Sequence, residues 1–301
     1  MKILITEFMD APAVARLAAK HEVIHEATLV DDAPRLLKLA ASADAIIVRN
    51  RTQVRGELLA ALSRCKVVGR LGVGLDNIDM AGCESRGIRV IPATGANAQS
   101  VAEYVIATAM LLLRGAYGSS AEVAAGKWPR AALTNGREIG GKTLGLVGYG
   151  SIGQLTGRLA RVLGMQVIAH DAAMPAGADV PSLALDALLA QADVVSLHVP
   201  LLPSTRHLID ARRLTAMKPG AVLINTARGG VVDEAALAEA LTSGHLAGAA
   251  LDVFEAEPLP AGSPFAGCPN LLLTPHVAGV TAEANERVSS LIAEKVLEAL
   301  A

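Results

Sequence analysis

Three residues whose side chains could do chemistry each follow an apolar run in the second half of the chain: Arg228, Glu257 and His276. Such runs are typical of buried parallel strands, whose carboxyl ends line the ligand crevice of a doubly wound sheet. An arginine binds a carboxylate, a histidine exchanges a proton near neutral pH, and a glutamate favours the protonated form of a nearby histidine. Together these residue types suit hydride transfer to a 2-oxo acid. Taken singly, Arg228 is equally consistent with a surface ion pair, His276 with a strand-end cap and Glu257 with a solvated loop carboxylate.

A glycine-rich segment, Gly148-Tyr-Gly-Ser-Ile-Gly153, lies between a predicted strand and a predicted helix. In this context Gly148 permits a tight turn, Gly150 lets the backbone approach a pyrophosphate, and Gly153 allows the helix to pack closely on the strand. The amides of Ser151 and Ile152 are then expected at a helix N-terminus, which favours an anion. The segment therefore predicts a dinucleotide site.

The acidic residue Asp171 follows the next predicted strand. An acid at this position can accept hydrogen bonds from a ribose diol and repels a 2′-phosphate, which favours NAD over NADP. The alternative is that Asp171 is a loop or cap residue. A second glycine cluster at Gly72 and Gly74 lacks the third glycine and the following helix, so we interpret it as a loop.

Short β-branched or leucine-rich runs alternate with alanine-rich helical stretches along the whole chain. This alternation predicts an α/β protein with two parallel sheets, each buried on both faces. The expected strands are residues 3–6, 23–25, 45–48, 67–70 and 89–91 in the first sheet, and 143–147, 166–169, 194–197, 222–225, 249–253 and 271–274 in the second.

The last predicted helix, residues 281–300, cannot form a domain alone and must pack on one already built. The simplest arrangement returns it to the N-terminal part of the chain. The expected domains are therefore a discontinuous one, residues 1–98 plus 281–301, and an inserted one, residues 99–280.

Composition excludes several classes of protein. The 301 residues include 27 Lys and Arg against 29 Asp and Glu and only 2% aromatic residues, so neither a basic nucleic-acid footprint nor a base-stacking platform is expected. The longest clean apolar run, residues 104–113, is too short to cross a bilayer. Three cysteines without a C-x-x-C pair favour the reducing cytoplasm over a disulfide framework. We expect a soluble protein, and the absence of metal-ligand spacing predicts no metal site.

Several spaced blocks resemble a known family. Residues 225–233, 251–258 and 274–279 resemble the signature blocks of the D-2-hydroxyacid dehydrogenases, and Gly69-Arg-Leu-Gly-Val-Gly-Leu-Asp-Asn-Ile-Asp79 with residues 100–103 resembles the D-3-phosphoglycerate dehydrogenase branch. The resemblance covers essentially the whole chain. It implies a Rossmann NAD domain inserted into a flavodoxin-like substrate domain, and a homodimer built around the inserted domain.

The resemblance also implies roles by position. His276 is the expected proton donor in reduction, Glu257 orients it and raises its pKa, and Arg228 binds the substrate carboxylate and polarises the carbonyl. The backbone of Val73 and Gly74 is expected to hold the other face of that carboxylate.

The resemblance implies further cofactor contacts at or after three of the later strands. His198 is expected near the cofactor without an assigned role, and Asp252 near the nicotinamide amide. The positions that match cofactor-contacting ones are Thr205, Thr226, Ala227 and Asp252.

The segment Val48-Arg-Asn-Arg-Thr-Gln-Val54 occupies the substrate-loop position of the family. Phosphoglycerate dehydrogenases often have Arg, a small polar residue, a small residue and Thr here, so Arg51 is an additional cation. With Arg49 it could hold an anion on the third carbon of the substrate, which points to 3-phosphoglycerate or 3-sulfolactate. Residues 6–10 and 49–52 are similar to the sulfolactate dehydrogenase group. The alternative is that Arg51 is a solvated loop residue.

Other functions stay open at this point. A broad glyoxylate/hydroxypyruvate reductase needs no clamp for a C3 anion, and NAD-sensing corepressors use the same fold as binding scaffolds. Formate dehydrogenase is disfavoured, because that relative pairs its histidine with glutamine where this chain has Glu257. The chain ends one helix after the last strand, so we expect no appended regulatory domain and no serine feedback.

Overall fold

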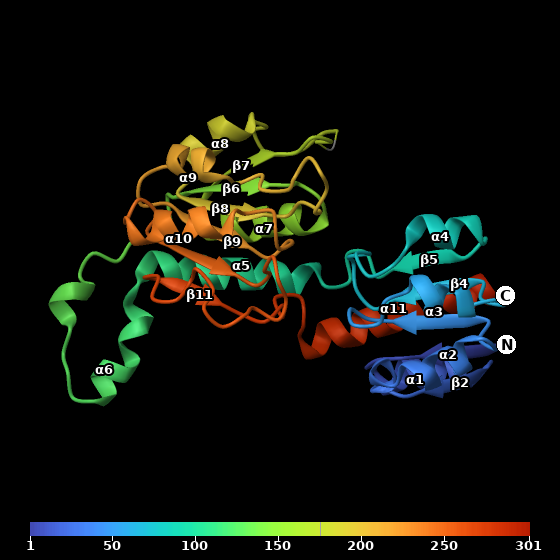
Figure 1. The fold of residues 1–301 in the computed structure, drawn as a ribbon. Helices are drawn as coiled ribbons and strands as arrows, with labels where there is room; N and C mark the ends of the chain where they lie inside the picture. The colour runs from blue at the N-terminus through green and yellow to red at the C-terminus, as the bar shows by residue number, and fades with distance from the viewer. Residues whose placement is uncertain (175) are drawn as a thin grey trace. The chain divides into compact units, whose positions relative to one another are not determined.

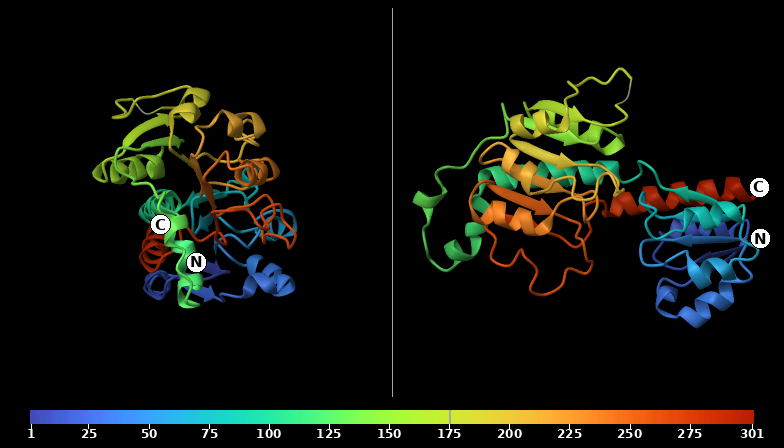
Figure 2. Two further views of the ribbon diagram at one scale, coloured as in Figure 1. Left: turned by 90° about the vertical axis from the view of Figure 1, so that its left-hand side faces the viewer. Right: turned by 45° about the horizontal axis from the view of Figure 1, so that its top comes forward.

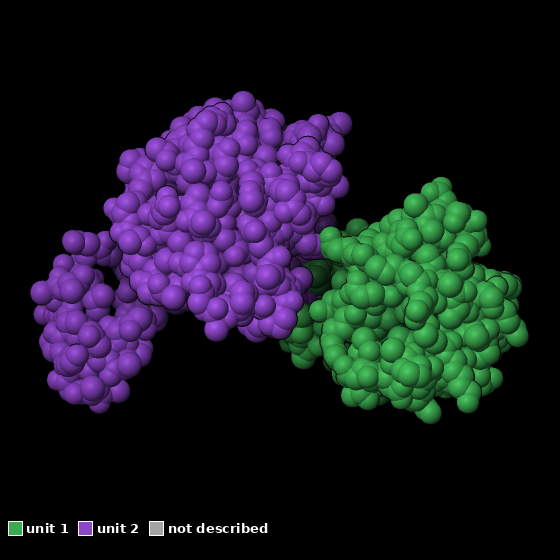
Figure 3. Space-filling model, viewed as in Figure 1, with its two compact units in different colours: residues 1–97, 280–301 green, residues 98–279 purple. Residues whose placement is uncertain are grey.

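The computed structural model describes residues 1–174 and 176–301. The chain divides into two compact units, which Figure 3 colours separately. Unit 1 comprises Met1–Asn97 and Val280–Ala301, and unit 2 comprises Ala98–Gly279.

Unit 1 is built on a five-stranded parallel sheet with the strand order β2-β1-β3-β4-β5. This is the flavodoxin-like order, 2-1-3-4-5. Ile3 of β1 pairs with Val23 on one side and with Ala45 on the other, so β1 lies inside the sheet. The strands are β1 (Lys2–Ile5), β2 (Glu22–His25), β3 (Ala45–Val48), β4 (Val67–Arg70) and β5 (Arg89–Pro92).

Helices cover both faces of this sheet (Figure 1). Alternate strand residues point to opposite faces, so Ile3 packs against α1 and α11 while Leu4 packs against α2, α3 and α4. Helix α11 belongs to the C-terminal segment, yet its Ile292 and Val296 are fully buried in the core of unit 1. The helical elements are α1 (Ala11–Ala18), η1 (Leu29–Asp31), α2 (Ala33–Ala40), α3 (Gly56–Ala61), α4 (Met80–Ser85) and α11 (Ala282–Leu300).

Unit 2 contains a six-stranded parallel sheet with the order β11-β10-β9-β8-β6-β7. Ser182 adds a single parallel bridge to Ala169 of β7, in the position of one further, very short strand. With that bridge the order follows the Rossmann pattern 3-2-1-4-5-6, and the order reverses between β6 and β8. The strands are β6 (Thr143–Val147), β7 (Gln166–His170), β8 (Val194–Leu197), β9 (Val222–Asn225), β10 (Gly248–Leu251) and β11 (Leu271–Leu273).

The two faces of the unit 2 sheet carry separate cores, and Figure 2 gives two further views of the layers. Helices α5 and α7 pack on one face, and α8, α9 and α10 pack on the other. An arm formed by residues 115–138, which includes α6, projects from the body of this unit (Figures 1 and 3). The helical elements are α5 (Ala98–Arg114), η2 (Ala116–Ser119), α6 (Ser120–Ala124), η3 (Arg130–Leu133), α7 (Ser151–Val162), α8 (Leu185–Gln191), α9 (Ala211–Ala216) and α10 (Glu234–Thr242).

The predicted fold class is confirmed: both units are α/β with parallel sheets. Each expected strand is present, with ends shifted by at most two residues. The largest shift is at β10, which ends at Leu251 because Asp252 and Val253 leave the sheet at the start of a loop. Among the described residues, no helix is long and apolar enough to span a membrane.

Candidate active site

The glycine-rich turn lies between β6 and α7, where the strand order of unit 2 reverses. Gly148 has φ +99°, and a Cβ there would lie 2.5 Å from the carbonyl oxygen of His198, so only glycine fits. Gly150 precedes α7 and has open space around it, and the helix begins at Ser151. Backbone amides at the start of this 12-residue helix therefore face accessible space, as an anion such as a pyrophosphate requires.

The carboxylate of Asp171 lies beside this turn at the end of β7. Its Oδ2 accepts a hydrogen bond from the amide of Tyr149 at 2.6 Å, and its Oδ1 accepts one from the amide of Ala173 at 2.8 Å. Each carboxylate oxygen can accept more than one hydrogen bond, so both can still receive a hydroxyl. The structure thus holds a negative charge next to the turn.

His198 follows β8 on the other side of the reversal point. Its Nε2 is 3.0 Å from Ser196 Oγ, and burial lowers the pKa of the imidazole to about 4. A neutral imidazole therefore borders the glycine-rich turn at neutral pH.

The loop after β9 contains two of the expected cofactor residues, Thr226 and Ala227. Asn225 closes this loop: its Oδ1 accepts from the amide of Ala227 at 3.0 Å, and its Nδ2 donates to the carbonyl of Arg228 at 3.0 Å. Thr226 Oγ1 is buried and has no hydrogen-bond partner within the part of the chain that the structure describes. Buried hydroxyls normally have partners, so this one is available to a ligand.

Thr205, the remaining threonine of the set, has a different environment. Its Oγ1 donates to the carbonyl of Pro200 at 2.6 Å and accepts from the amide of Leu202 at 2.7 Å. The side chain therefore shapes the loop after β8.

Asp252 follows β10 and organises the loop that holds His276. The carboxylate is 1% exposed; it accepts from the amides of Val277 and Ala278, both at 2.8 Å, and from the hydroxyl of Thr274 at 2.6 Å. The carbonyl of Asp252 also accepts from the amide of His276 at 2.8 Å. His276 itself has φ +56°, a left-handed conformation that few non-glycine residues adopt and that this hydrogen-bonded frame maintains.

The histidine and the glutamate of the predicted catalytic set are in direct contact. His276 Nδ1 lies 2.8 Å from Glu257 Oε2, and Glu257 Oε1 accepts from the amide of Phe254 at 3.1 Å. Because an ionised carboxylate only accepts hydrogen bonds, Nδ1 carries a hydrogen, and the exchangeable position is Nε2. Both side chains are partly exposed and therefore accessible to a ligand.

Arg228 adjoins the same loop through its neighbour Gly229. A Cβ on Gly229 would lie 1.7 Å from the carbonyl oxygen of Phe254 and 2.7 Å from the amide nitrogen of Glu255. The backbone that carries Arg228 is therefore pressed against the loop that carries Glu257. A second anchor of that loop is Glu234, whose Oε1 accepts from the amide of Glu255 at 2.7 Å.

In unit 1 the segment after β3 is held by a buried carboxylate that the sequence analysis did not single out. Glu7 is 4% exposed and accepts hydrogen bonds from the amides of Arg49, Arg51 and Thr52. Asn77 donates to the carbonyl oxygens of Arg49 and Thr52.

The two arginines of this segment differ. Arg49 is half-buried, its Nη2 donates to Asn285 Oδ1 at 2.9 Å, and its guanidinium lies 5.9 Å from the ring centre of Phe8. Burial lowers the pKa of Arg49, which stays far above neutrality. Arg51 is exposed and forms an ion pair with Asp31.

Val73 and Gly74 lie in the loop after β4, next to the segment after β3 in strand order. Val73 is exposed and Gly74 is half-buried. Among the described residues, no group of three or more His, Cys, Asp or Glu side chains could hold a metal ion.

A family model for the D-isomer specific 2-hydroxyacid dehydrogenases, NAD binding domain, matches residues 106–278, more than half of the chain. The chain belongs to the D-isomer specific 2-hydroxyacid dehydrogenases. The resemblance seen in the sequence is thereby confirmed. So are its reaction class, the NAD-dependent interconversion of a 2-hydroxy acid and a 2-oxo acid, and NAD as the cofactor.

Two curated relatives match nearly the full length of this chain. The chain is 54% identical over 303 residues to an (S)-sulfolactate dehydrogenase of Chromohalobacter salexigens, covering 99% of this chain and 98% of the relative. It is 41% identical over 305 residues to a D-3-phosphoglycerate dehydrogenase of Mycobacterium tuberculosis, covering 99% of this chain but 57% of the relative.

Solved structures also match nearly the whole of this chain. The crystal structure of the TT0316 protein from Thermus thermophilus matches with a TM-score of 0.92 and 37% identity, covering 100% of this chain and 97% of the other. A D-lactate dehydrogenase from Aquifex aeolicus, complexed with NAD and lactic acid, matches with a TM-score of 0.88 and 30% identity, covering 99% and 95%.

Proposed function

We propose that this dehydrogenase acts on a D-configured 2-hydroxy acid with a second anionic group on its third carbon, either 3-sulfolactate or 3-phosphoglycerate. The observation that carries the proposal is the segment after β3, where Arg49 and Arg51 stand two positions apart on a rigidly bonded backbone. Two cations in one short segment favour a dianion over a monoanion.

We assign the reaction to the three contiguous loops of unit 2. His276 donates the proton at Nε2 to the carbonyl oxygen during reduction and accepts it back during oxidation. Glu257, bonded to Nδ1, holds the imidazole in the orientation that presents Nε2. Arg228 binds the substrate carboxylate and stabilises the negative charge that develops on the carbonyl oxygen.

The cofactor residues fit NAD. The glycine turn offers amides at a helix N-terminus, the carboxylate of Asp171 can receive the ribose hydroxyls, and Thr226 Oγ1 is a buried hydroxyl without a protein partner. When bound, NAD accepts or donates the hydride at C2 of the substrate. Asp171 supports a preference for NAD over NADP, because its charge opposes a 2′-phosphate.

The name of the relative from C. salexigens is compatible with a D-isomer specific family. In 3-sulfolactate the sulfomethyl substituent has a higher priority than the carboxylate when the (R) or (S) label is assigned, because sulfur has a higher priority than oxygen. The arrangement called D in lactate is therefore labelled (S) in sulfolactate, and the same face of the oxo acid is reduced.

NADH oxidation with four oxo acids tests the proposed substrate: 3-sulfopyruvate, 3-phosphohydroxypyruvate, hydroxypyruvate and glyoxylate. The expected result is a kcat/KM for one of the first two that exceeds both others by about ten-fold or more, as one charge-assisted contact supplies. A higher kcat/KM for hydroxypyruvate or glyoxylate would instead identify a broad hydroxypyruvate reductase.

Arg51 can be tested separately with a matched control. Arg35 is also exposed and also forms an ion pair, with Glu26, in the same unit. Arg51→Ala is expected to raise KM for the dianionic oxo acid, whereas Arg35→Ala is not. Equal KM values for the two variants would remove Arg51 from the binding site.

We also propose that the enzyme is a homodimer assembled through the arm of unit 2. The arm elements η2, α6 and η3, all described, contain no buried residue, and the arm exposes Tyr117, Val123 and Trp128, the last at 78%. Burial of such apolar side chains drives association. Sedimentation is expected to give a dimer for the wild type and for Met80→Glu, an exposed position in unit 1, and a monomer for Trp128→Glu. A cytoplasmic location is proposed on the cysteine pattern alone.

A further inference from the structure

The segment Arg49–Thr52 is bonded on both its donor and its acceptor side. Glu7 Oε1 accepts from the amides of Arg49 at 2.8 Å and Thr52 at 3.0 Å, and Oε2 accepts from the amide of Arg51 at 3.1 Å. Asn77 Nδ2 donates to the carbonyl of Arg49 at 3.0 Å and to that of Thr52 at 2.7 Å. Two side chains thus fix most of the backbone of a loop that would otherwise be free to change shape.

Both anchoring side chains are buried. Glu7 is 4% exposed and Asn77 is 6% exposed, and Thr52, at 1%, is linked by its hydroxyl to that of Thr6 at 2.8 Å. A carboxylate removed from water needs several hydrogen bonds, and here the loop amides provide three. The carboxylate and the loop therefore stabilise each other.

The anchors come from neighbouring strands. Glu7 follows β1, the loop follows β3, and Asn77 lies after β4, and these three strands are adjacent in the sheet. The arginine side chains of the loop do not contribute to this backbone frame. Arg49 makes its contacts with Asn285 and Phe8, and Arg51 pairs with Asp31.

We propose that Glu7 is a positioning residue for the anion-binding loop, and that with Asn77 it sets the preference for a substrate with an anionic group on C3. The proposal rests on the function proposed above. Glu7 acts through the loop backbone. It holds the two arginines in place before the substrate binds, so that the affinity for a dianionic substrate is not lowered by the entropy cost of ordering the loop. A monoanionic oxo acid has no C3 anion to meet the arginines and is indifferent to the order of the loop.

Glu7→Gln tests the idea with little change of shape. The amide keeps one oxygen for the amides of Arg49 and Thr52, but its NH2 group then faces the amide of Arg51 without an acceptor. We expect kcat/KM for the preferred C3-dianionic oxo acid to fall about ten-fold or more, chiefly through KM, since hydrogen bonds to charged groups are the strong ones. The kcat/KM for hydroxypyruvate should change much less.

A second measurement is independent of the substrate. Hydrogen exchange of the amides in residues 48–54, followed by mass spectrometry on the free enzyme, should be about ten-fold faster in Glu7→Gln. NADH affinity reports that unit 2 is intact and should not change. Asn77→Ala, which removes both donations, is expected to give the same exchange and KM changes.

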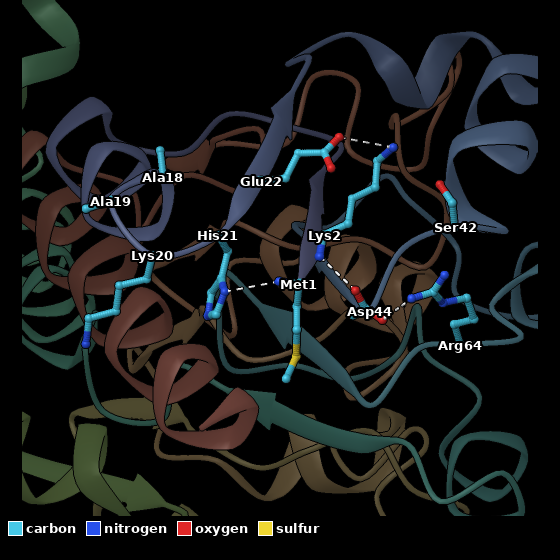
Figure 4. A pocket seen from close by; sticks show the side chains of 10 residues that line it. All are labelled: Met1, Lys2, Ala18, Ala19, Lys20, His21, Glu22, Ser42, Asp44 and Arg64. Atoms are coloured by element: carbon cyan, nitrogen blue, oxygen red, sulfur yellow. Dashed lines mark hydrogen bonds and ion pairs between the residues drawn. The ribbon is translucent and has the colours of Figure 1, made fainter.

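Asp44 provides a matched control in the same unit. It is 8% exposed and accepts from the amide of Lys2 at 2.8 Å and from Arg64 at 3.1 Å, at the opposite, amino-terminal end of β3 (Figure 4). Asp44→Asn should lower stability as any lost carboxylate contact does, without altering exchange at residues 48–54 or the ratio of kcat/KM between dianionic and monoanionic substrates.

The outcomes separate the two proposals. If the wild type does not prefer a C3 dianion, the proposed substrate class is wrong, and the exchange experiment alone decides whether Glu7 orders the loop. If the wild type prefers the dianion but Glu7→Gln lowers both kcat/KM values equally, or leaves exchange at residues 48–54 unchanged, the positioning role of Glu7 is overturned.

Discussion

A methyl group added at Gly229 would enter the space of the loop that carries Glu257. Built on the present backbone, the Cβ of Gly229→Ala lies 1.7 Å from the carbonyl oxygen of Phe254 and 2.7 Å from the amide nitrogen of Glu255. Non-bonded carbon and oxygen atoms do not approach closer than about 3 Å, so this peptide would have to recede by about 1 Å or more. The amide of Phe254 is bonded to Glu257 Oε1, and Glu257 would move with it.

The cost falls mainly on catalysis. A displacement of about 1 Å in a catalytic group costs about 100-fold in rate, so kcat/KM for any oxo acid should drop by about two orders of magnitude. The overpacked loop should also lower the free energy of unfolding by about 1–3 kcal/mol. NADH affinity should hold, because the glycine turn after β6 is a separate loop.

Steady-state NADH oxidation gives kcat/KM, fluorescence titration gives the NADH dissociation constant, and thermal unfolding gives the stability. Gly140→Ala is the matched control: it lies in the same unit, and its nearest neighbour would be the carbonyl oxygen of Leu163 at 3.8 Å, an ordinary contact. The control should behave as the wild type. A Gly229→Ala enzyme with wild-type kcat/KM would refute the argument that tight packing at Gly229 holds the loops of Arg228 and Glu257 in place.

Three further outcomes follow from the site. Glu257→Gln should reduce kcat/KM about 100-fold at unchanged NADH affinity, because it weakens the contact that orients His276; a small effect on kcat would contradict that role. Asp171→Ser should lower the ratio of kcat/KM with NADH to that with NADPH about ten-fold, and an unaltered ratio would argue against charge discrimination. Burial lowers the pKa of His198 from 6.5 to about 4, so the unfolded chain binds one more proton between these values and stability falls as pH falls through that window. Between pH 7 and pH 4.5 the free energy of unfolding, measured with urea, should fall less in His198→Gln than in the wild type, by at most about 3 kcal/mol. An equal fall in both proteins would show that another group is responsible.

The parts that could be predicted from the sequence are those whose partners are close in the chain. The glycine turn, the strand before it and the helix after it are contiguous, so Gly148, Gly150 and Gly153 indicate their own surroundings. The strands could be predicted as well, because a buried parallel strand is a continuous apolar run that can be identified without knowing which strands lie beside it.

The contacts that sequence reasoning missed join residues that are far apart in the chain. Glu7 meets amides more than 40 positions later, and nothing in the residues around it signals a buried carboxylate. Asp252 is expected near the nicotinamide amide, but its hydrogen bonds to the amides of Val277 and Ala278 appear only once β10 and β11 lie side by side. The close approach of Gly229 to Phe254 is of the same kind.

The position of α11 has a consequence for the order of synthesis. Its Ile292, Val296 and Leu300 complete the apolar core beneath β1, β3 and β4, which are all translated before unit 2. Unit 2, made in between, has all its strands before α11 is translated, so it can fold while unit 1 still exposes one face of its sheet. Chains that are truncated before residue 282 and released would therefore display the unfinished unit 1, and not the later-translated unit 2, to chaperones and proteases.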